Sequence, residues 1–529
     1  MTTSGAVHRY HDGTKHHFHR FARSLGYLDW ASQPNPFRSF AGAPPIALRQ
    51  RSIVIADILR HSLGLSAWKE LRRSPGSTPS ARWSLRVNPS SGNLHPTEAY
   101  VIAGPSAGLD DDGGVYHYAA DRHALERRCA FDPAAFAASG DASFLVAFTS
   151  IHWREAWKYG ERAFRYCQHD LGHAIAAVRI AAALHDLHAR LLPEWSHADI
   201  AAATGIDRDE DYVDAEREEP GCVLLIDRPP ADDVTGREPA IGRAESIVAA
   251  ARGGAWTGRA SQLSDDHVQW TFIDQIAEAT RDPGRTDVPG TPPAPALPAP
   301  PGPPFSARVI LQRRSAVALD GASSIPADHF VDMLRGVMPR GDAAPWDALW
   351  WDARIHLALF VHRVIGVEPG LYVLVRGDRA IDRLRRACRR EFLWTDAHVD
   401  LPLFLLARGD CRALARRLSC DQDIAADGFF SLGMIADFDA SLERVGASFY
   451  RHLFWESGIV GQVLYLEAEA KGVRATGIGC FYDDPVHEVL GLEGHAFQSL
   501  YHFTVGVHVE DTRLTTEPGY AWEHAEIKN

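Results

Sequence analysis

Hydrophobic residues follow two patterns along the chain, and together they predict a mixed structure of helices and sheets. Residues 174–187 (AIAAVRIAAALHDL) and 459–470 (IVGQVLYLEAEA) are apolar on nearly every side, which predicts two helices buried among other elements. Short apolar runs predict buried strands at residues 100–103, 222–226, 355–361 and 503–507. Each half of the chain therefore reads as a sheet flanked by helices, which is the α+β class.

A constant spacing of 286 residues relates the two halves. The pattern R-x4-[D/E]-x-G occupies residues 165–172 and again residues 451–458. Residues 114–129 and 370–388 both predict a strand, a turn and a helix. Four pairs share the offset of 286: Gly160 and Gly446, Arg165 and Arg451, Gly172 and Gly458, Gly205 and Gly491. Four matches without a gap favour an internal duplication, and two copies predict a pseudo-dimer within one chain.

A proline-rich segment separates these halves. Residues 283–304 contain ten prolines in 22 residues. Such a composition favours extended polyproline II and predicts a linker. We expect an N-terminal extension at 1–45, a first domain at 46–240, a connecting helix and linker at 241–305 and a second domain at 306–529.

Composition and charge narrow the class of protein. A chain of 529 residues with 46% hydrophobic residues and a mean hydropathy of -0.20 is suited to two or three globular domains. The net charge of -13 repels phosphate backbones, so we expect no nucleic acid partner. The seven cysteines include no C-x-x-C pair, which favours neither a disulfide framework nor a thiolate zinc site and suits a reducing cytoplasm. No apolar leader or membrane-length segment is seen, so we expect neither export nor a membrane span.

The loop before the predicted strand at residue 100 reads NPSSGNLHP. It offers the hydroxyls of Ser90 and Ser91, the amide of Asn93 and a glycine that permits close backbone approach. A flat heteroaromatic ligand needs polar groups of this kind at a strand edge. A proline-bounded turn without a ligand is the alternative, and composition alone favours it.

A second polar string, LQRRS, opens the second half directly after the linker. Arg313 and Arg314 with the Ser315 hydroxyl suit a dianionic phosphate, because guanidinium groups bind it bidentately and keep their charge when desolvated. A solvated surface string is about equally consistent with these residues, and a strand is predicted at 316–321. The similar string that ends at Ser52 lies too close to the following helix, so Ser52 is interpreted as a helix N-cap.

Four strings resemble the motifs of the flavin-dependent nitroreductase superfamily: PSSGNLHP, LQRRS, GIGCF at 477–481 and VEDTR at 509–513. The string WKYGERAFRY at 157–166, followed by Asp170 and His173, resembles the thiazoline/oxazoline dehydrogenase branch, the SagB/ThcOx type. The resemblance runs in tandem from about residue 80 to Arg513. It implies two tandem nitroreductase-like domains and FMN as the cofactor.

In that family FMN lies at a dimer interface and both protomers contribute to its site. This chain divides the corresponding residues between its halves: Ser90, Ser91 and Asn93 in the first, and Arg313, Arg314, Ser315, Gly477, Ile478, Gly479 and Arg513 in the second. The resemblance implies that the arginines hold the phosphate, and that N–H groups of a glycine-rich turn at 477–479 stabilise the flavin. The loop before residue 355 lacks PSSxN, and residues 191–195 (LLPEW) replace the glycine-rich turn. The resemblance thus implies one FMN site per chain and one degenerate site.

Lys158 and Tyr159 match the pair to which the family resemblance assigns proton removal. A phenol with a pKa of about 10 is a poor base unless a cation lowers that pKa, and the adjacent ammonium is a candidate. The side chains of adjacent residues on a helix point about 100° apart, so Lys158 and Tyr159 can act together only at the end of a helix. A surface pair with snorkelling side chains is the alternative. The register equivalents are Arg444 and Val445, so the pair occurs once.

Several other side chains have competing interpretations. No metal site is expected, and hydrogen-bonded or solvated groups are the preferred interpretation of the N-terminal histidines. His95 and His173 fall within the family-like strings, and Trp350 and Trp351 either wall the degenerate site or fill core. The clustered N-terminal histidines are His8, His11, His16, His17 and His19.

The resulting hypothesis is an FMN-dependent oxidoreductase of the SagB/ThcOx dehydrogenase type. It oxidises an azoline-like or related small or peptide-derived substrate, with O2 reoxidising the flavin. The alternatives are an NAD(P)H-dependent nitro or quinone reductase and a non-catalytic flavin- or peptide-binding scaffold. Because a pseudo-dimer satisfies its own interface, we expect a monomer.

Overall fold

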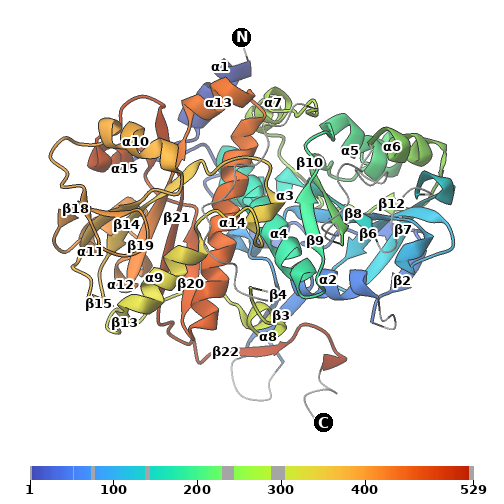
Figure 1. Cartoon of the computed structure of the whole chain (residues 1–529). Coiled ribbons are helices and arrows are strands. Elements are labelled where there is room, and N and C mark those ends of the chain that lie inside the picture. The colour runs from blue at the N-terminus through green and yellow to red at the C-terminus, as the bar shows by residue number, and fades with distance from the viewer. Residues whose placement is uncertain are drawn as a thin grey trace.

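Two helix-flanked sheets stand on either side of a pair of central helices (Figure 1). The computed structural model describes residues 3–49, 51, 53–72, 78–136, 143–228, 244–286 and 304–523. Ser52 and most of the proline-rich segment lie outside these residues. None of the described helices combines the length and apolar composition that a bilayer crossing requires.

The first sheet is antiparallel along its main path. Its central order is β7 (Ala124–Phe131), β6 (Gly113–Ala119), β5 (Thr97–Ala103), β8 (Phe144–Ser150), β10 (Glu219–Asp227) and β9 (His188–Leu191). The short strands β11 (Ala255–Trp256) and β2 (Pro45–Ala47) both pair with β7. The strands predicted at 100–103 and 222–226 lie in β5 and β10, which confirms both.

The second sheet repeats this arrangement. Its order is β17 (Thr395–Asp396), β18 (Leu403–Arg408), β16 (Gly370–Leu374), β14 (Ile355–Val361), β19 (Phe430–Asp437), β21 (Phe497–Gly506) and β20 (Arg474–Ile478). When β5 is matched with β14, the remaining strands follow in the same chain order and with the same neighbours. The two halves therefore share one topology, with the strands predicted at 355–361 and 503–507 in β14 and at the end of β21.

The two predicted buried helices form the centre of the molecule. Helix α4 (Ala163–Ala183) and helix α14 (Phe449–Ala470) pack directly against each other (Figure 1). A Cβ atom at Gly172 would overlap the carbonyl oxygen of Trp455, and one at Gly458 would overlap that of His169. The glycine pair in the repeat thus lets two helix backbones touch at their crossing.

The other repeated glycines end equivalent helices. Gly160 follows α3 (His152–Tyr159) and Gly446 follows α13 (Asp439–Val445), with φ angles of 55° and 106°. Gly205 and Gly491 cap α5 (His197–Thr204) and α15 (Asp483–Leu490) in the left-handed conformation, with φ angles of 72° and 78°. A glycine adopts positive φ without the steric cost of a Cβ atom. The glycines related by the offset of 286 therefore have the same structural role in the two halves.

Two predicted elements differ in the structure. Residues 124–131 form strand β7, whereas the corresponding segment of the second half forms helix α10 (Ile381–Ala387), as predicted. Strand β7 is stabilised by three partners, β6, β2 and β11, which no local pattern reveals. Residues 316–321 are not a strand and make only isolated bridges from Ser315 to Ala475 and from Leu319 to His508.

The N-terminal segment packs on the second half of the chain. Helix α1 (Thr3–Gly13) lies beside α13 (Figure 1), and His8 Nε2 lies 2.8 Å from Asp439 Oδ1. His11 is fully buried and its Nε2 lies 2.9 Å from Gln498 Oε1. These contacts agree with the hydrogen-bonded interpretation of both histidines, and they show that the extension bridges to the distant half.

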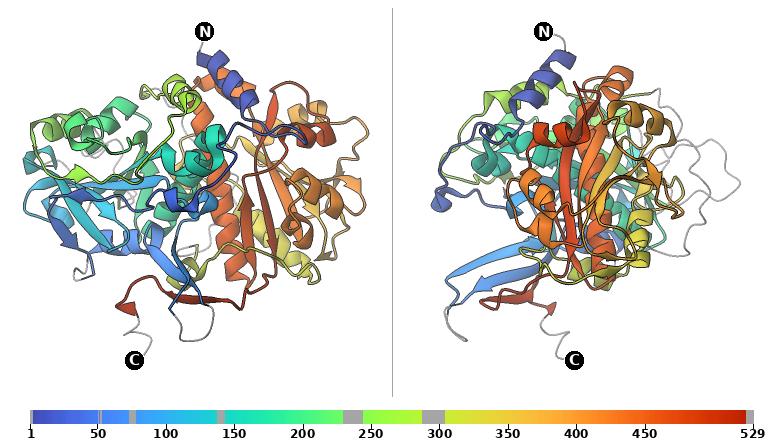
Figure 2. Two further views of the ribbon diagram at one scale, coloured as in Figure 1. Left: turned by 180° about the vertical axis from the view of Figure 1, so that it is seen from behind. Right: turned by 90° about the vertical axis from the view of Figure 1, so that its left-hand side faces the viewer.

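Strands from the first and the second half of the chain meet in a third sheet. Strand β3 (Leu65–Leu71) pairs with β4 (Ala81–Arg86) and with β22 (Leu514–Pro518). This sheet projects from the body of the molecule (Figure 2). It carries part of the wall of the cavity described next.

Candidate active site

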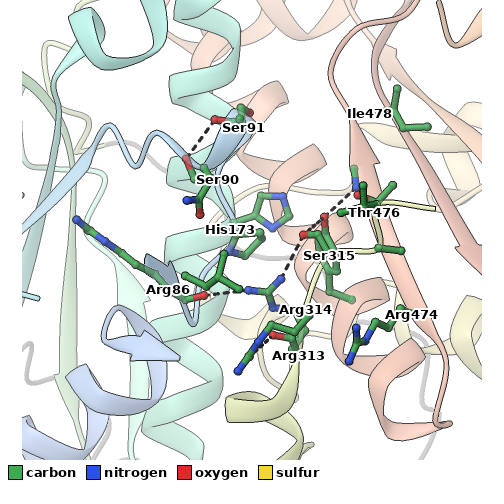
Figure 3. A pocket seen from close by; sticks show the side chains of 18 of the residues that line it. Arg86, Ser90, Ser91, His173, Arg313, Arg314, Ser315, Arg474, Thr476 and Ile478 are labelled. Atoms are coloured by element: carbon green, nitrogen blue, oxygen red, sulfur yellow. Dashed lines mark hydrogen bonds between the residues drawn. The ribbon is translucent and has the colours of Figure 1, made fainter. Parts of the chain in front are cut away.

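A cavity of about 880 Å³ lies between the two halves, and both halves line it. The first half contributes the loop at 88–95 and the start of α4, and the second contributes residues 312–317 and strand β20 (Figure 3). Of the predicted site residues, the lining includes Ser90, Ser91, Asn93, Arg313, Arg314, Ser315, Gly477, Ile478, Gly479 and Tyr159. Sequence strings about 220 to 390 residues apart thus meet at one place.

The loop before β5 is held by its own polar side chains. Ser91 donates from its backbone N–H (3.0 Å) and its hydroxyl (3.1 Å) to Asp170 on α4. The Ser90 hydroxyl accepts the His95 N–H at 2.7 Å, and Asn93 Oδ1 lies 3.0 Å from His95 Nε2. The hydroxyl of Ser91 and the amide of Asn93 therefore hold the loop in a fixed shape at the cavity wall.

Asp170 is a functional candidate to which the sequence analysis gave no role, although it lies in the repeat and in the family-like string. Its carboxyl group is buried and lines the cavity. Burial raises its pKa to about 7, although hydrogen bonds from Ser90 and Ser91 act to lower it. An acidic group with such a pKa can exchange a proton near neutral pH.

Two arginines of the LQRRS string lie at the other end of the cavity (Figure 3). Arg313 is buried and donates from Nη2 to the carbonyl oxygens of Arg86 and Val87, both at 3.0 Å. Arg314 donates to the carbonyl oxygen of Ser66 at 2.9 Å. Burial, with Arg313 as the next cause, lowers the pKa of Arg314 to about 10. Crowded cations of this kind favour an anionic ligand.

Arg513 does not line this cavity, contrary to the expected phosphate contact. Its side chain is 76% exposed and is engaged by Asp511, with contacts of 2.7 and 2.9 Å. Arg474, at the start of β20, lines the cavity instead (Figure 3), together with Lys69 and His508. Arg474 lies two residues before Thr476 in strand β20, so both side chains point to the same face of the strand, and both residues line the cavity.

The glycine-rich string is an edge strand rather than a turn. Gly477 and Ile478 end β20, and the Gly477 N–H donates to the Tyr465 hydroxyl at 2.9 Å. A Cβ atom at Gly477 would overlap the Tyr501 hydroxyl, and one at Gly479 would overlap the ring of Tyr166. The expectation of a turn at 477–479 was therefore wrong for Gly477 and Ile478, which lie in strand β20. These glycines make room for tyrosines that line the cavity.

Lys158 and Tyr159 lie at the C-terminal end of α3, where the geometric condition for joint action is met. A Cβ atom at Gly92 would lie 2.6 Å from the Tyr159 hydroxyl and 3.2 Å from Lys158 Nζ, so both side chains reach the same loop position. Tyr159 lines the cavity, whereas Lys158 is not among the lining residues. The pair thus approaches the site through the PSSGN loop.

The pKa shifts of this pair run opposite to the expectation. Burial, followed by the carboxylate of Glu155, raises the pKa of Tyr159 well above 10. Burial lowers the pKa of Lys158, and Glu155 acts in the opposite direction. The prediction that the ammonium lowers the pKa of Tyr159 was wrong, because desolvation outweighs it. These directions keep Tyr159 protonated near neutral pH and make Lys158 lose its proton more readily than a solvated lysine.

The cavity fits FMN in both size and polarity. A volume of about 880 Å³ lies within the usual range for small-molecule sites, which is about 300–1,000 Å³. In the described part of the chain, Asn88 Oδ1, His95 Nδ1 and Arg313 Nε are buried without a hydrogen-bond partner, and all three residues line the cavity. Unpaired buried polar groups are costly, so they favour a polar ligand. Three tyrosines that the sequence analysis did not name as site residues also line the cavity: Tyr166, Tyr465 and Tyr501.

Comparisons with known proteins agree with this geometry. Residues 364–507 match the nitroreductase family. A crystal structure from Anabaena variabilis ATCC 29413, provisionally described as a nitroreductase, is 20% identical, with a TM-score of 0.68 over 95% of this chain and 99% of that chain.

Other solved structures resemble smaller parts of the chain. One is the E. coli microcin synthetase McbBCD complex with truncated pro-MccB17 bound (18% identity, 43% of this chain, 82% of that chain, TM-score 0.24). Another is an oxidoreductase containing FMN (16% identity, 41% of this chain, 81% of that chain, TM-score 0.21). The comparison with curated proteins found no match. The chain thus has a nitroreductase-like fold and carries a nitroreductase-family match in its second half.

Proposed function

We propose that the chain is an FMN-dependent oxidoreductase with one flavin site between two tandem nitroreductase-like domains at 46–240 and 306–529. The observation that carries this proposal is a cavity that complementary strings from both halves line together. In a pseudo-dimer the second half supplies what a separate protomer supplies in a dimer, so a monomer suffices.

The residues present suit each end of the cofactor. Arg314 and Arg474 would hold the phosphate, with Arg313 and Ser315 positioning that corner of the cavity. The loop of Ser90, Ser91 and Asn93 would form one wall against the ring system, opposite strand β20. When bound, FMN supplies a hydride acceptor.

Lys158 and Tyr159 would serve substrate oxidation of the SagB/ThcOx dehydrogenase type. The amine of Lys158, whose pKa is lowered by burial, accepts the proton that leaves a substrate carbon. Tyr159, whose pKa is raised, keeps its proton and donates a hydrogen bond that orients the substrate or the amine. An azoline-like or related small or peptide-derived substrate is the proposed class, with O2 reoxidising the flavin.

The first experiment is the visible spectrum of the purified chain, with the released flavin identified and counted. One FMN per chain is the expected result. Two per chain would show that the equivalent region of the other side also binds flavin, and none after reconstitution with FMN would contradict the proposal. Mixing the FMN-loaded chain with NADH or NADPH without oxygen then separates the activities. Rapid bleaching of the flavin would favour a nitro or quinone reductase, whereas an unchanged spectrum supports the dehydrogenase.

A further inference from the structure

Two cysteines that are distant in sequence meet at the edge of the cavity. The Sγ atoms of Cys420 and Cys480 lie 2.8 Å apart, and both side chains are half-buried. Cys480 also lines the cavity, directly after Gly479. Because a disulfide bond is about 2.05 Å long, a movement of less than about 1 Å would join the two sulfurs.

The segments that carry the two cysteines are tied together by other bonds. Gln422 donates from Nε2 to the carbonyl oxygens of Ser419 (2.8 Å) and Cys480 (3.1 Å). The Tyr482 N–H donates to the carbonyl oxygen of Leu418 at 2.9 Å. The backbone therefore holds the thiols beside each other whether or not they are bonded.

The two thiols differ in their surroundings, because Cys480 lines the cavity and Cys420 is not among the lining residues. The hydrogen bond with Cys420 is the largest cause that lowers the pKa of Cys480, and the guanidinium of Arg162 lowers it further. The same contact raises the pKa of Cys420. A thiolate is the attacking species in disulfide exchange, so Cys480, which faces the cavity, is the attacking residue and Cys420 the resolving one. The other five cysteines are all buried.

We propose that Cys420 and Cys480 form a redox-active dithiol that is oxidised by small disulfides at the cavity wall. The Cys480 thiolate attacks one sulfur of the disulfide, which releases one thiolate and leaves a mixed disulfide on Cys480. The Cys420 thiol loses its proton and attacks the Cys480 sulfur, which releases the second thiolate. The protein loses two electrons and two protons, and the small disulfide becomes two thiols. This exchange does not depend on the proposed flavin.

The test uses the aromatic disulfide DTNB on the reduced, folded chain, with and without FMN. Two thionitrobenzoate ions released per chain, no adduct left on the protein and a Cys420–Cys480 peptide in the digest are expected. Dithiothreitol should restore both thiols. Adducts that persist on both cysteines, or no reaction in the folded chain, would overturn the proposal.

Two variants sharpen this test. Cys420→Ser should release one thionitrobenzoate and keep one stable adduct on Cys480, because the resolving thiol is gone. Cys411→Ser removes a buried cysteine of the same half and should behave like the unchanged chain. If the Cys420→Ser variant also ends without an adduct, another thiol resolves the mixed disulfide and the assignment of Cys420 is wrong. The peptide mapping of the unchanged chain tests the pairing even where a variant fails to fold.

Discussion

The two sides of the pseudo-dimer have the same scaffold but different interiors. On one side the loop before β5 borders the cavity, and Tyr465 of α14 lines it. On the other side the loop before β14 carries Trp351, which packs on the His452 ring with centroids 4.9 Å apart. The position 286 residues before Tyr465 is Arg179, which forms an ion pair with Asp347 at 2.6 Å. Trp351, Arg179 and Asp347 thus lie, on one side of the pseudo-dimer, in the region that corresponds to the cavity on the other side.

The acidic residue of the repeat shows the same division. Asp170 and Glu456 both accept backbone N–H groups just before the equivalent strands β5 and β14. Glu456 is also paired with Arg376 at 2.6 Å, whereas Asp170 has no basic partner in the described part of the chain. The duplication preserved the fold-holding contact in both halves, and of these two acids Asp170, beside the cavity, is the one without a basic partner in the described residues.

Removal of the Lys158 amine should have the largest effect. Lys158→Met should lower turnover by about 10²–10⁴-fold with FMN retained, because proton transfer by a positioned group contributes on that order. Tyr159→Phe removes only the orienting hydrogen bond, so it should lower turnover by less, also with FMN retained. The measurement is kcat with flavin occupancy determined in parallel. Arg444→Met, at the register equivalent of Lys158, is the matched control and should leave turnover unchanged. Full activity of Lys158→Met would remove the amine from the mechanism.

Glu456→Gln should cost about 3–5 kcal/mol in the free energy of unfolding. The change leaves the buried Arg376 guanidinium without its carboxylate, and breaking a buried ion pair has a cost of that size. Urea unfolding of the variant and the unchanged chain measures the difference. A loss below about 1 kcal/mol would show that the pair is not required on this side.

Asp170 should make stability depend on pH. Its pKa of about 7 in the folded chain lies above the usual value of 3.8, so its stabilising contribution is complete below about pH 4 and is lost as the pH rises to about 7. At about 1.4 kcal/mol per pKa unit the upper limit is about 4 kcal/mol. Asp170→Asn should flatten the unfolding free energy between pH 4 and 7. An unchanged pH profile would contradict the raised pKa.

The helix crossing should tolerate no added methyl group on either half. Gly172→Ala and Gly458→Ala each place a Cβ atom against a backbone carbonyl oxygen and should lower the free energy of unfolding by about 1–3 kcal/mol. Gly253→Ala, at a helical glycine where a Cβ atom has no neighbour within 4 Å, is the control and should be neutral. Unequal losses at Gly172 and Gly458 would show that the crossing is not symmetric.

An effect of similar size is expected for the phosphate contacts. Arg314→Ala should weaken FMN binding by about ten- to a hundredfold, because a hydrogen bond to a charged group contributes about 1.5–3 kcal/mol. Arg513→Ala is the matched control, since Arg513 lies outside the cavity lining and is paired with Asp511. Fluorescence titration of the flavin-free chain with FMN measures both. Full FMN affinity in Arg314→Ala would contradict its proposed role.

Much of the fold was predictable from the sequence because it depends on local pattern. The all-round apolar runs became α4 and α14, and the repeated glycines became helix caps and a helix crossing. The PSSGN and LQRRS strings do line one cavity. Strand β7 was predicted as a helix because two of its strand partners, β2 and β11, lie far away in the sequence.

The sequence by itself determined the two central helices and four of the buried strands, where the repeat lies and that the PSSGN and LQRRS strings face a cavity. Only the tertiary structure decided that Arg474 rather than Arg513 lines it, and that Cys420 and Cys480 touch. It also reversed the expected pKa shift of Tyr159. The physical reason is that helix and strand patterns are set by neighbours in sequence, whereas desolvation and side-chain contact are set by residues that folding brings together.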